Sequence, residues 1–510
     1  MSVTILTARA HRLFAPVVDA LGRCAKRGED VLLLVPEQFT LAAERGVMER
    51  LSLTGMFLID VMSPSRLSEQ VLAAAGRDGR EPLDAAGRRM ALSQALERLE
   101  DKLPYYGSIA QRRGFVEKLD ALITDMKRGG LDPDRLKDYA DTLPAGSSRD
   151  KLTDLAKVYA QYREVLRGRF SDSEDQLAYV AGRLADSGFL RDKHLFVYGF
   201  DTLPEQLMRL LSAAVPLCKS LTIALICDAK TAPDGELYAP VRQGIARFQK
   251  MLFLSGESAK LHALPPQLPD RPEAIAYLDR ALFAHPAPAF AGRPEGVYLS
   301  DGLSPYEEAA LMTREVRWLL AQGVDPERVA VFYPDGGGYA FAVTAALEDS
   351  GIPFYTDQQL SAASHGLAQF WLAALRAMAG GWRNRDMLCL IKSGYAPLTF
   401  EEGCELENYA YCYGVDRARW TRPFTRGPEA TRAEALHVRL MEPLLRARAA
   451  LVAARDATAS LTAAFGLLQD VHAYDALKRE EERLLESGFM TRASQNSQVW
   501  QAVLRLIDQL

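Results

Sequence analysis

The stretch VLLLVPEQFT, residues 31–40, decides the fold of this chain. Its first five residues form a continuous apolar run, which is typical of a strand buried on both faces of a parallel sheet. Pro36 ends the run, and residues 41–51 follow with a helical pattern. FLIDVM at residues 57–62 repeats the arrangement, with Ser-Pro-Ser and a helical stretch at 66–75 behind it. The sequence therefore predicts strand–loop–helix units and an α/β fold.

Further strand signals lie on both sides of a long helical block. VTIL at residues 3–6 is the first predicted strand, and LFVY at 195–198 and LTIALIC at 221–227 are later ones. Between them the apolar residues are spaced by about 3.6, and strand signals are absent. The segments with the clearest helical spacing are 85–99, 115–128 and 151–166. We therefore predict a discontinuous sheet domain, residues 1–75 plus 183–262, with an inserted helical domain at 76–182.

A second α/β unit follows a proline-rich connection. Seven prolines between residues 263 and 294 disfavour regular structure and suit an inter-domain connection. Beyond it we predict the start of a second sheet domain at 295–366 and a helical domain at 367–510. The second sheet domain has a helix at 305–321 and strands at 296–299, 329–333 and 352–355. The sequence ends in a helical pattern without a stop signal, so we expect the front part of a longer polypeptide.

Composition excludes several classes of protein. The 510 residues are 48% hydrophobic and 25% charged, with a mean hydropathy of -0.10, as in ordinary globular chains. No apolar run approaches the roughly 20 residues that span a bilayer, and no secretory signal is present, so we expect a cytoplasmic protein without membrane contacts. Six scattered cysteines without a CxxC pair predict reduced, mostly buried thiols. Seven histidines without HxxxH spacing predict no metal site.

The charge balance permits local nucleic-acid binding but not a uniformly basic coat. The net charge is -5 and the isoelectric point is near 5.9. Nine arginines nevertheless gather between residues 416 and 455, against four carboxylates. They form either a solvated helix face, which we favour, or a basic surface for a polyanion.

The loop after the first strand does not have the composition of a phosphate cradle. A nucleotide-binding turn needs glycines and a Lys-Ser/Thr pair, because backbone N–H groups wrap the phosphates while the lysine meets their charge. TARAHRLFAP at residues 7–16 has neither. We interpret Ala8, Arg9, Arg12 and Phe14 as a degenerate phosphate loop. Hydrolysis also needs an acidic pair at a later strand end, where this chain has only Asp201, so we predict no catalytic residues.

Two short motifs have structural interpretations that we prefer to chemical ones. SDSED at residues 171–175 could be a carboxylate cluster, but Ser171 with Glu174 fits a helix capping box. DGGGY at 335–339 lacks a following Lys-Ser/Thr pair, so we interpret it as a hinge.

The other strand-end loops carry side chains suited to single-stranded nucleic acid. PEQFT at residues 36–40 and SPSR at 63–66 follow buried strands, and open α/β sheets bind ligands at that edge. Glutamine and arginine can contact base edges, and an aromatic ring can stack on a base. In the alternative interpretation Gln38 and Thr40 cap the next helix, and Arg66 pairs with a carboxylate.

An ordered series of motifs resembles the AddB family, one of the two kinds of subunit in bacterial AddAB helicase–nucleases. The motifs that carry the resemblance are VPEQFT (35–40), SRL (65–67), GFVE (114–117), KR (127–128), KLTDL (151–155), SED (173–175), GF (199–200), GWR (381–383), LENY (406–409), YG (413–414) and RWT (419–421). The resemblance covers the chain from residue 1 to about 510. It implies two degenerate RecA-like parallel-sheet domains of the superfamily 1 (UvrD-like) helicase type, each with a helical insertion or extension.

The resemblance also implies a function and site residues. The family's pocket for the Chi-type recombination hotspot carries over as Gln38, Thr40, Arg66 and Phe200, while two further pocket positions, usually aromatic, align with Pro64 and Glu69. Most members keep a GRxGSGKT loop, where this chain has residues 8–15 of different composition. Members are about twice as long, and their second half carries a nuclease domain and a 4Fe-4S cluster. We therefore expect no cofactor in this chain, although ATP and magnesium serve the family's complex.

Three functions remain open at this stage. The first is a non-catalytic part of an AddB-like subunit that holds single-stranded DNA, scans for the hotspot and assists an AddA-like helicase–nuclease subunit in double-strand break repair. The second is an active ATPase or helicase whose unusual phosphate loop is built on Arg9 and Arg12. The third is a protein-interaction module that does not touch DNA.

Overall fold

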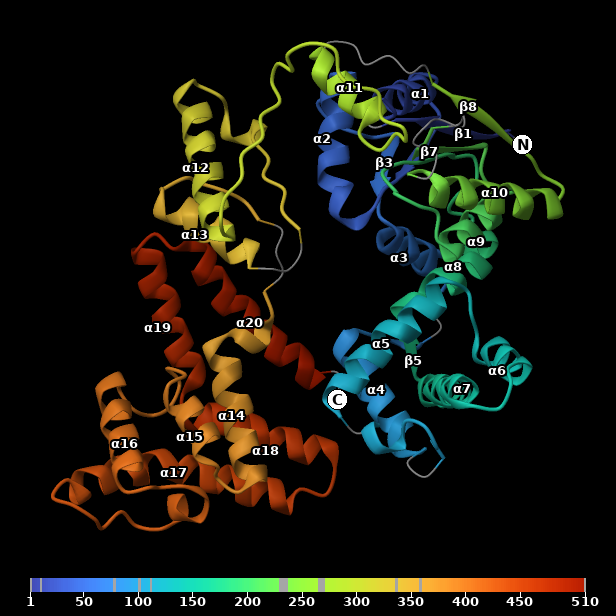
Figure 1. Cartoon of the computed structure of the whole chain (residues 1–510). Helices are drawn as coiled ribbons and strands as arrows, with labels where there is room; N and C mark the ends of the chain where they lie inside the picture. The colour runs from blue at the N-terminus through green and yellow to red at the C-terminus, as the bar shows by residue number, and fades with distance from the viewer. Residues whose placement is uncertain are drawn as a thin grey trace. The chain divides into compact units, whose positions relative to one another are not determined.

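A computed structural model of the chain describes residues 2–9, 12–76, 79–99, 102–110, 112–228, 237–264, 271–334, 338–356 and 360–508. By its contacts the chain divides into two compact units, Met1–Asp301 and Gly302–Leu510 (Figure 1). The side chains of the capping box expected at Ser171 and Glu174, and most of the hinge expected at 335–339, lie outside the described residues.

Unit 1 contains a six-stranded, wholly parallel sheet in the order β3-β2-β6-β7-β1-β8. The strands are β1 (Ser2–Ala8), β2 (Val31–Leu34), β3 (Ile59–Met62), β6 (His194–Val197), β7 (Ser220–Ile226) and β8 (Ala259–Ala263). The strands predicted at 3–6, 31–35, 57–62, 195–198 and 221–227 are therefore confirmed, and so is the α/β class.

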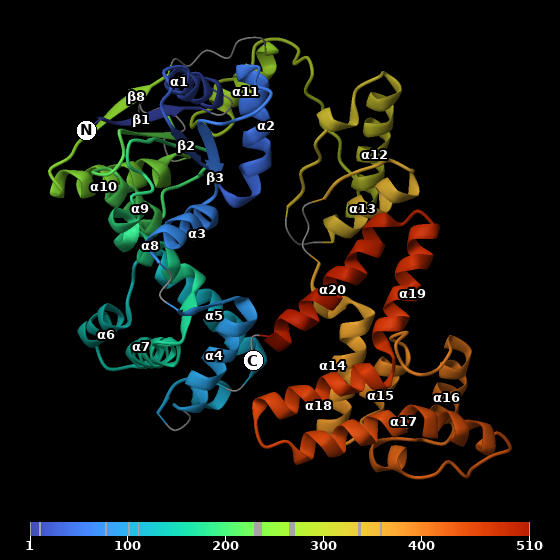
Figure 2. The ribbon, with the colours of Figure 1, turned by 180° about the vertical axis from the view of Figure 1, so that it is seen from behind.

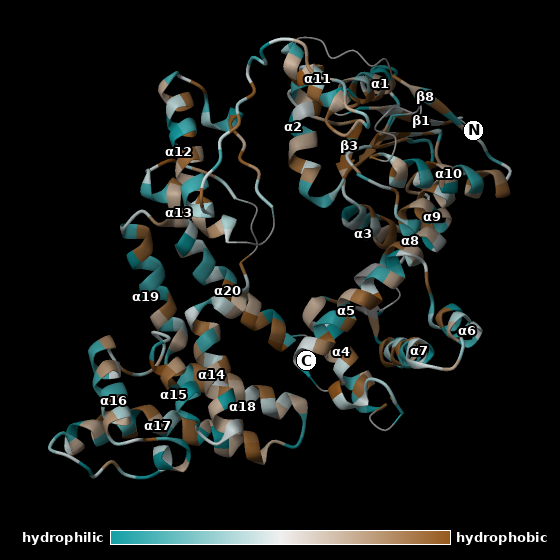
Figure 3. Ribbon diagram, in the orientation of Figure 1, coloured by the Kyte–Doolittle hydropathy of each residue, from teal (hydrophilic) through white to brown (hydrophobic). Residues whose placement is uncertain are grey.

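The continuous apolar run of β2 is explained by helices on both faces of the sheet. Val31 and Leu33 pack with α1 (Phe14–Lys26) and α2 (Thr40–Leu51), whereas Leu32 and Leu34 face the opposite layer. That layer consists of α3 (Pro64–Ala75), α8 (Ser173–Ser187), α9 (Glu205–Ala214) and α10 (Ala239–Leu254). Figure 3 shows the apolar character of the strands around β3. Because alternate residues of a strand point to opposite faces, both sets must be apolar.

The helical block between β3 and β6 forms a separate lobe of unit 1, which we call the helical lobe; the rest of unit 1 is the sheet lobe (Figure 2). Its helices are α4 (Ala85–Glu97), α5 (Arg113–Arg128), α6 (Pro133–Thr142) and α7 (Ser147–Leu166). Asp84 and Asp132 cap the first turns of α4 and α6 with their carboxylates. The helices expected at 85–99, 115–128 and 151–166 are confirmed.

Three strands escaped prediction for the same reason, which is that none is a buried apolar run. β4 (Glu81–Leu83) and β5 (Phe170–Asp172) pair in parallel within the block where we expected no strand. Each has three residues, too few to show a period of two. β8 lies at the sheet edge and is mostly exposed, with the sequence AKLHA.

The proline-rich segment is more regular than expected. Residues 273–281 form α11 (Glu273–Ala281), and the contacts place it with unit 1. Pro272 occupies the N-cap position, and no proline lies inside the helix. Prolines that flank a helix are compatible with it, because only an interior proline removes a helical hydrogen bond.

Unit 2 is helical in the part that the structure describes. Its helices are α12 (Pro305–Ala321), α13 (Tyr339–Asp349), α14 (Gly366–Gly380), α15 (Asn384–Ile391), α16 (Phe400–Cys412), α17 (Ala430–Ala453), α18 (Ala457–Asp470), α19 (Ala473–Glu486) and α20 (Met490–Asp508). Thr399 and Glu402 form a complete capping box at α16. One large apolar core is shared by all the helices from α14 through α20, and a smaller core lies between α12 and α13.

The strands expected at 296–299, 329–333 and 352–355 are not present. None of these residues has a strand partner among the described residues, and Gly296, with a φ of +75°, lies in a turn. Val329 and Tyr333 pack against the small core of α12 and α13, whereas Leu299 and Phe332 are almost fully exposed. A strand forms only where a neighbour pairs with its backbone groups, so an apolar pattern alone is insufficient.

No helix among the described residues is long and apolar enough to cross a membrane. The six cysteines are free thiols, of which Cys24, Cys218 and Cys227 are buried, while Cys412 is exposed. Burial raises the pKa of the Cys218 thiol to about 11.

Candidate nucleic-acid interface

At the carboxyl edge of the sheet, the connections that leave β2 and β6 diverge to opposite faces. The chain leaves β2 through α2 toward β3, and it leaves β6 through α9 toward β7 on the opposite face. Connections that run to opposite sides from adjacent parallel strands open a crevice at their carboxyl ends, where α/β proteins bind ligands. The loops after β2, β3 and β6 surround this point, and we call them the open loops (residues 35–40, 63–66 and 198–202).

The loop after β2 presents Gln38 to solvent. Pro36 ends the strand, and a single 3-10 turn, Glu37–Phe39, leads into α2. The ring of Phe39 packs on Tyr198 with centroids 5.7 Å apart, which fixes the turn, and burial raises the pKa of Tyr198. Gln38 is exposed and has no hydrogen-bond partner among the described residues. The Thr40 hydroxyl donates to the carbonyl of Glu37 at 3.3 Å, and neither residue caps α2.

A carboxylate ties this loop to the start of α3, where Arg66 lies. Glu37 accepts hydrogen bonds from the backbone N–H of Ser65 at 3.0 Å and from its hydroxyl at 2.9 Å. The Ser63 hydroxyl accepts from the N–H of Arg66, with Pro64 in the first helical turn. A negative charge at a helix N-terminus is stabilising, so Glu37 holds the two loops together. The Arg66 side chain stays 60% exposed, and its one ion pair among the described residues, to Glu44, is long at 3.8 Å.

The loop after β6 completes the group. Gly199 has a φ of +84°, and a Cβ there would lie 3.2 Å from Pro36 Cδ, so the two loops touch through the glycine. Phe200, the next residue, is half-buried and packs against the apolar core rather than standing free. Gln38, Thr40, Arg66 and Phe200 therefore come from three loops that contact one another. The alternative interpretation holds only for Arg66, which does pair with a carboxylate.

At the same edge of the sheet, the arginines of the loop after β1 pair with carboxylates of the protein itself. Two N–H groups of Arg9 donate to Asp228 Oδ2 at 3.1 and 3.0 Å, and Arg12 pairs with Asp279 Oδ2 at 3.3 Å. Both arginine side chains are only 8% exposed. Asp228 follows β7, and Asp279 comes from α11, whose backbone carbonyl at the same residue also contacts Arg9. Protein carboxylates therefore already meet the charge that would attract phosphates.

The other residues of the degenerate loop are also packed. Ala8 is buried at the end of β1, and Phe14 packs on Tyr198 with ring centroids 5.3 Å apart. The described residues of this loop offer neither a free cation nor a glycine turn, so they do not fit a bound ATP–magnesium. A 4Fe-4S cluster does not fit the described residues either, because it needs clustered thiolates and none are grouped.

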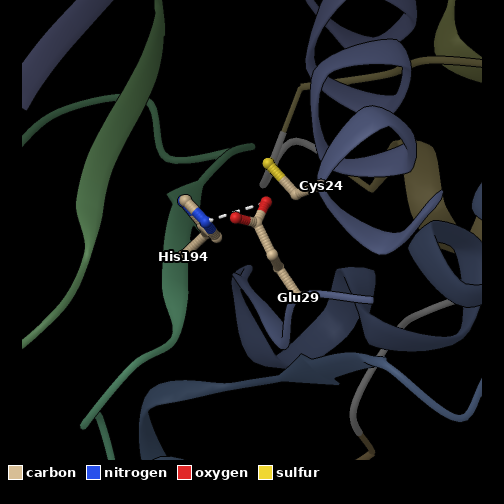
Figure 4. A group of neighbouring side chains, drawn as sticks. All are labelled: Cys24, Glu29 and His194. Carbon is tan, nitrogen blue, oxygen red and sulfur yellow. Dashed lines mark ion pairs between the residues drawn. The ribbon is translucent and has the colours of Figure 1, made fainter. Parts of the chain in front are cut away.

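One group of side chains combines metal-binding residue types, at the opposite end of the sheet. Cys24, Glu29 and His194 place their ligand atoms within 4.8 Å of one another (Figure 4). His194 Nε2 lies 3.3 Å from Glu29 Oε2, and its Nδ1 hydrogen-bonds to the Ser220 hydroxyl at 2.7 Å. Spacing in the sequence could not reveal this group, since its members are up to 170 residues apart.

Arg27 already supplies the cation for this group. Its Nε donates to Glu29 at 2.8 Å, and another N–H lies 3.3 Å from Cys24 Sγ. The hydrogen bond from Arg27 is the largest cause that lowers the pKa of Glu29. We therefore interpret the group as an ion-pair cluster that joins the end of α1 to the start of β6.

Four of the nine arginines between residues 416 and 455 make ion pairs among the described residues, including Arg417 with its neighbour Asp416. Arg432 binds Glu402 and Glu405 of α16, Arg439 also contacts Glu402, and Arg446 contacts Asp470 of α18. Arg432, Arg439 and Arg446 join α17 to its neighbours, and the interpretation of the whole segment as a solvated helix face stays a prediction.

Comparison with known proteins agrees with the order of motifs along the chain. The family model described as "ADDB, N-terminal" matches residues 11–268, half of the chain. The chain belongs to the AddB family. This membership confirms the resemblance carried by VPEQFT and the motifs that follow it.

Curated relatives extend the similarity over nearly all of the chain. The AddB-type subunit of the "ATP-dependent helicase/deoxyribonuclease" of Pelotomaculum thermopropionicum is 28% identical over 95% of the chain, and its namesake in Alkaliphilus oremlandii is 24% identical over 94%. The protein of the same name in Moorella thermoacetica is 27% identical over 98%. The chain spans 44% to 46% of the length of these AddB-family relatives.

Proposed function

We propose that this chain is a non-catalytic, DNA-binding part of a helicase–nuclease subunit that works in double-strand break repair and recombination. Its role is to hold single-stranded DNA and to read a Chi-type hotspot while a partner subunit of the AddA type drives translocation in the cytoplasm. The relatives' names support a subunit of a helicase and deoxyribonuclease.

The contrast between Arg66 and the two arginines of the loop after β1 carries the proposal. Arg66 is exposed beside Gln38 on loops held by Glu37, whereas Arg9 and Arg12 are buried against carboxylates. Exposed glutamine and arginine at the carboxyl ends of parallel strands can contact base edges, which gives sequence preference. Arginines that already pair with carboxylates offer less attraction to a triphosphate, which weighs against an ATPase built on Arg9 and Arg12. Phe200 is packed, and we propose that it supports the pocket and that the polar side chains read the bases.

Selection from a random single-stranded DNA library tests the proposal. The wild-type chain should enrich a short motif, and Arg66→Ala should weaken that enrichment because a good bidentate base contact discriminates by about 1–3 kcal/mol. General affinity should fall much less than the enrichment. Arg45→Ala, which removes an exposed charge on α2, is the matched control and should keep the motif. Absence of any binding to single-stranded DNA at low salt contradicts the proposal, and so does equal enrichment by wild type and Arg66→Ala.

We also propose that residues 1–75 with 183–262 form a first RecA-like domain and that residues 295–366 begin a second, with residues 76–182 and 367–510 as their helical companions. The stretches at 329–333 and 352–355 support this arrangement, since Val329, Tyr333 and Ile352 pack on α12 and α13 while Phe332 is exposed. One-sided packing is what strands covered by a single helical layer present.

Amide hydrogen exchange tests the second sheet. Residues 329–333 and 352–355 should exchange fast in the isolated chain, because their amides lack a ladder, and slowly once the partner subunit is added. Equal exchange in both states contradicts the proposed second sheet domain.

A further inference from the structure

A groove in unit 1 lies where the sheet lobe meets the helical lobe, and none of its lining residues belongs to the open loops. Its walls come from the end of α5, the start of α6, the second half of α7, α8 and α9, and its volume is about 750 Å³. The comparisons and the family motifs give it no role.

The floor of the groove is built from buried polar contacts between elements of both lobes. Lys127 Nζ lies 2.9 Å from Asp172 Oδ2, with both side chains 2% exposed, and the Tyr162 hydroxyl donates to the same oxygen at 2.8 Å. Gln206 of α9 donates to the Lys127 carbonyl at 3.1 Å. A buried ion pair with satisfied partners fixes geometry, because displacing either charge leaves the other unpaired. The groove is therefore a fixed feature of unit 1.

Cations dominate its described lining, with six basic side chains and three carboxylates, in a chain of net charge -5. The basic residues are Arg80, Lys127, Arg135, Arg163, Arg167 and Arg209. Arg163 is exposed on α7 and has no ion pair among the described residues. The pairs of Arg135 with Asp132, at 4.0 Å, and of Arg167 with Glu164, at 3.4 Å, are solvent-exposed. Such pairs are weak, so a phosphate can replace the carboxylates at little cost.

An aromatic ring lies among these charges. Tyr179 of α8 lines the groove half-buried, and the Arg80 guanidinium sits over its ring at 5.1 Å. Sites for single-stranded nucleic acid combine a basic track for the backbone with rings on which bases stack. Cations spread over four elements suit an extended polyanion better than a single phosphate.

The groove is also close in sequence and packing to the open loops. Gln206 and Arg209 lie on α9, which begins five residues after Phe200. Tyr179 lies on α8, which packs along α3, the helix whose first turn carries Arg66.

We propose that this groove is a second binding site of unit 1, for the sugar–phosphate backbone of single-stranded DNA. It supplies affinity that does not depend on sequence, while the open loops supply sequence preference. The proposal rests on the proposed DNA-binding function and adds a separate place where the strand is held.

The test is a paired charge reversal in the full chain. Arg163→Glu with Arg167→Glu changes two exposed groove residues that have no buried partner, so the fold should be kept, as circular dichroism would verify. Arg98→Glu with Lys118→Glu makes the same charge change on exposed residues of α5 and the end of α4 that do not line the groove. Fluorescence anisotropy with a labelled single-stranded oligonucleotide, over a range of salt concentrations, measures affinity.

We expect the groove variant to lose roughly tenfold or more in affinity at low salt, and the control to lose less than about threefold. The slope of log affinity against log salt should become shallower by about 1.4 for the groove variant, since each phosphate contact to a single strand contributes about 0.7. Wild-type affinity and slope in the groove variant would overturn the proposal, and so would an equal loss in the control.

The outcomes separate this proposal from the proposed function. If the groove variant loses affinity while Arg66→Ala leaves library enrichment unchanged, the groove proposal is supported and the proposed base-reading role of Arg66 is contradicted. If Arg66→Ala abolishes enrichment and the groove variant binds single-stranded DNA with wild-type affinity, only the groove proposal is contradicted. Photo-cross-linking with a bromouracil-containing oligonucleotide adds a positional readout. Cross-links to the peptide that contains Tyr179 support the groove, and cross-links confined to other parts of the chain overturn it.

Discussion

Arg9 and Arg66 follow strands of one parallel sheet at the same edge, yet the structure treats them in opposite ways. Arg9 is 8% exposed and makes two hydrogen bonds to Asp228, whereas Arg66 is 60% exposed with one contact at 3.8 Å. The difference shows that strand-end position alone does not make a binding site. What decides is whether the rest of the fold supplies a counter-charge, and here α11 and the end of β7 do so for β1 alone.

The largest expected effect comes from removing the counter-charge of Arg9. Asp228→Ala should lower the free energy of unfolding by about 3 kcal/mol, because it leaves a buried guanidinium without its carboxylate. Glu44→Ala makes the same kind of change at Arg66 and should cost less than about 0.5 kcal/mol, as for an exposed pair. Urea denaturation measures both values. Equal losses of unfolding free energy in the two variants would contradict the contrast between the buried, paired Arg9 and the exposed Arg66.

A smaller effect is expected at the contact between the open loops. Gly199→Ala should destabilise the chain by about 2 kcal/mol, because φ is positive and the new Cβ would press on Pro36. Gly28→Ala has a similar φ of +76° but open space around it, so it should cost only about 1 kcal/mol. The difference between the two isolates the contact that joins the loops. Library enrichment should also weaken for Gly199→Ala and stay normal for Gly28→Ala.

The smallest expected effect concerns nucleotide. Addition of about 1 mM Mg-ATP should leave the melting temperature unchanged, since Arg9 and Arg12 are already paired. A ligand present at 100 times its Kd would stabilise the native state by about 2.7 kcal/mol, which thermal denaturation would detect. Such a shift would mean that phosphates displace Asp228 and Asp279, and it would revive the ATPase hypothesis.

The sequence was most informative where burial was complete. The run VLLLV predicted β2 because both faces of that strand are covered, and Ser-Pro-Ser predicted the start of α3 because Ser63 caps it. β8 and the β4–β5 pair were missed, since exposed or three-residue strands leave no pattern. The apolar pattern at 329–333 predicted a strand that has no partner in the part of the chain that the structure describes, because strand formation depends on distant residues.

The candidate site was predictable in its members but not in its arrangement. The resemblance singled out Gln38, Thr40, Arg66 and Phe200. Strand-end position alone also pointed to the two loops that hold the first three of these residues. The arrangement depends on contacts between residues 28 to 267 positions apart. These are the hydrogen bonds of Glu37 with Ser65 and the ion pairs of Arg9 with Asp228 and of Arg12 with Asp279. No local pattern encodes such pairs. The basic groove was missed for the same reason, since its basic residues come from four separate helices and the segments beside them.

The interleaved strand order has a consequence for biosynthesis. β1 is made first, yet its neighbours in the sheet are β7 and β8, which are made more than 200 residues later. The amino-terminal strand must therefore wait, unpaired, while the ribosome adds the whole helical lobe, whose contacts are mostly local and can form early. A pause or premature stop before residue 259 would leave an apolar strand edge open to aggregation, so nascent chains of this protein should depend on chaperones until β8 emerges.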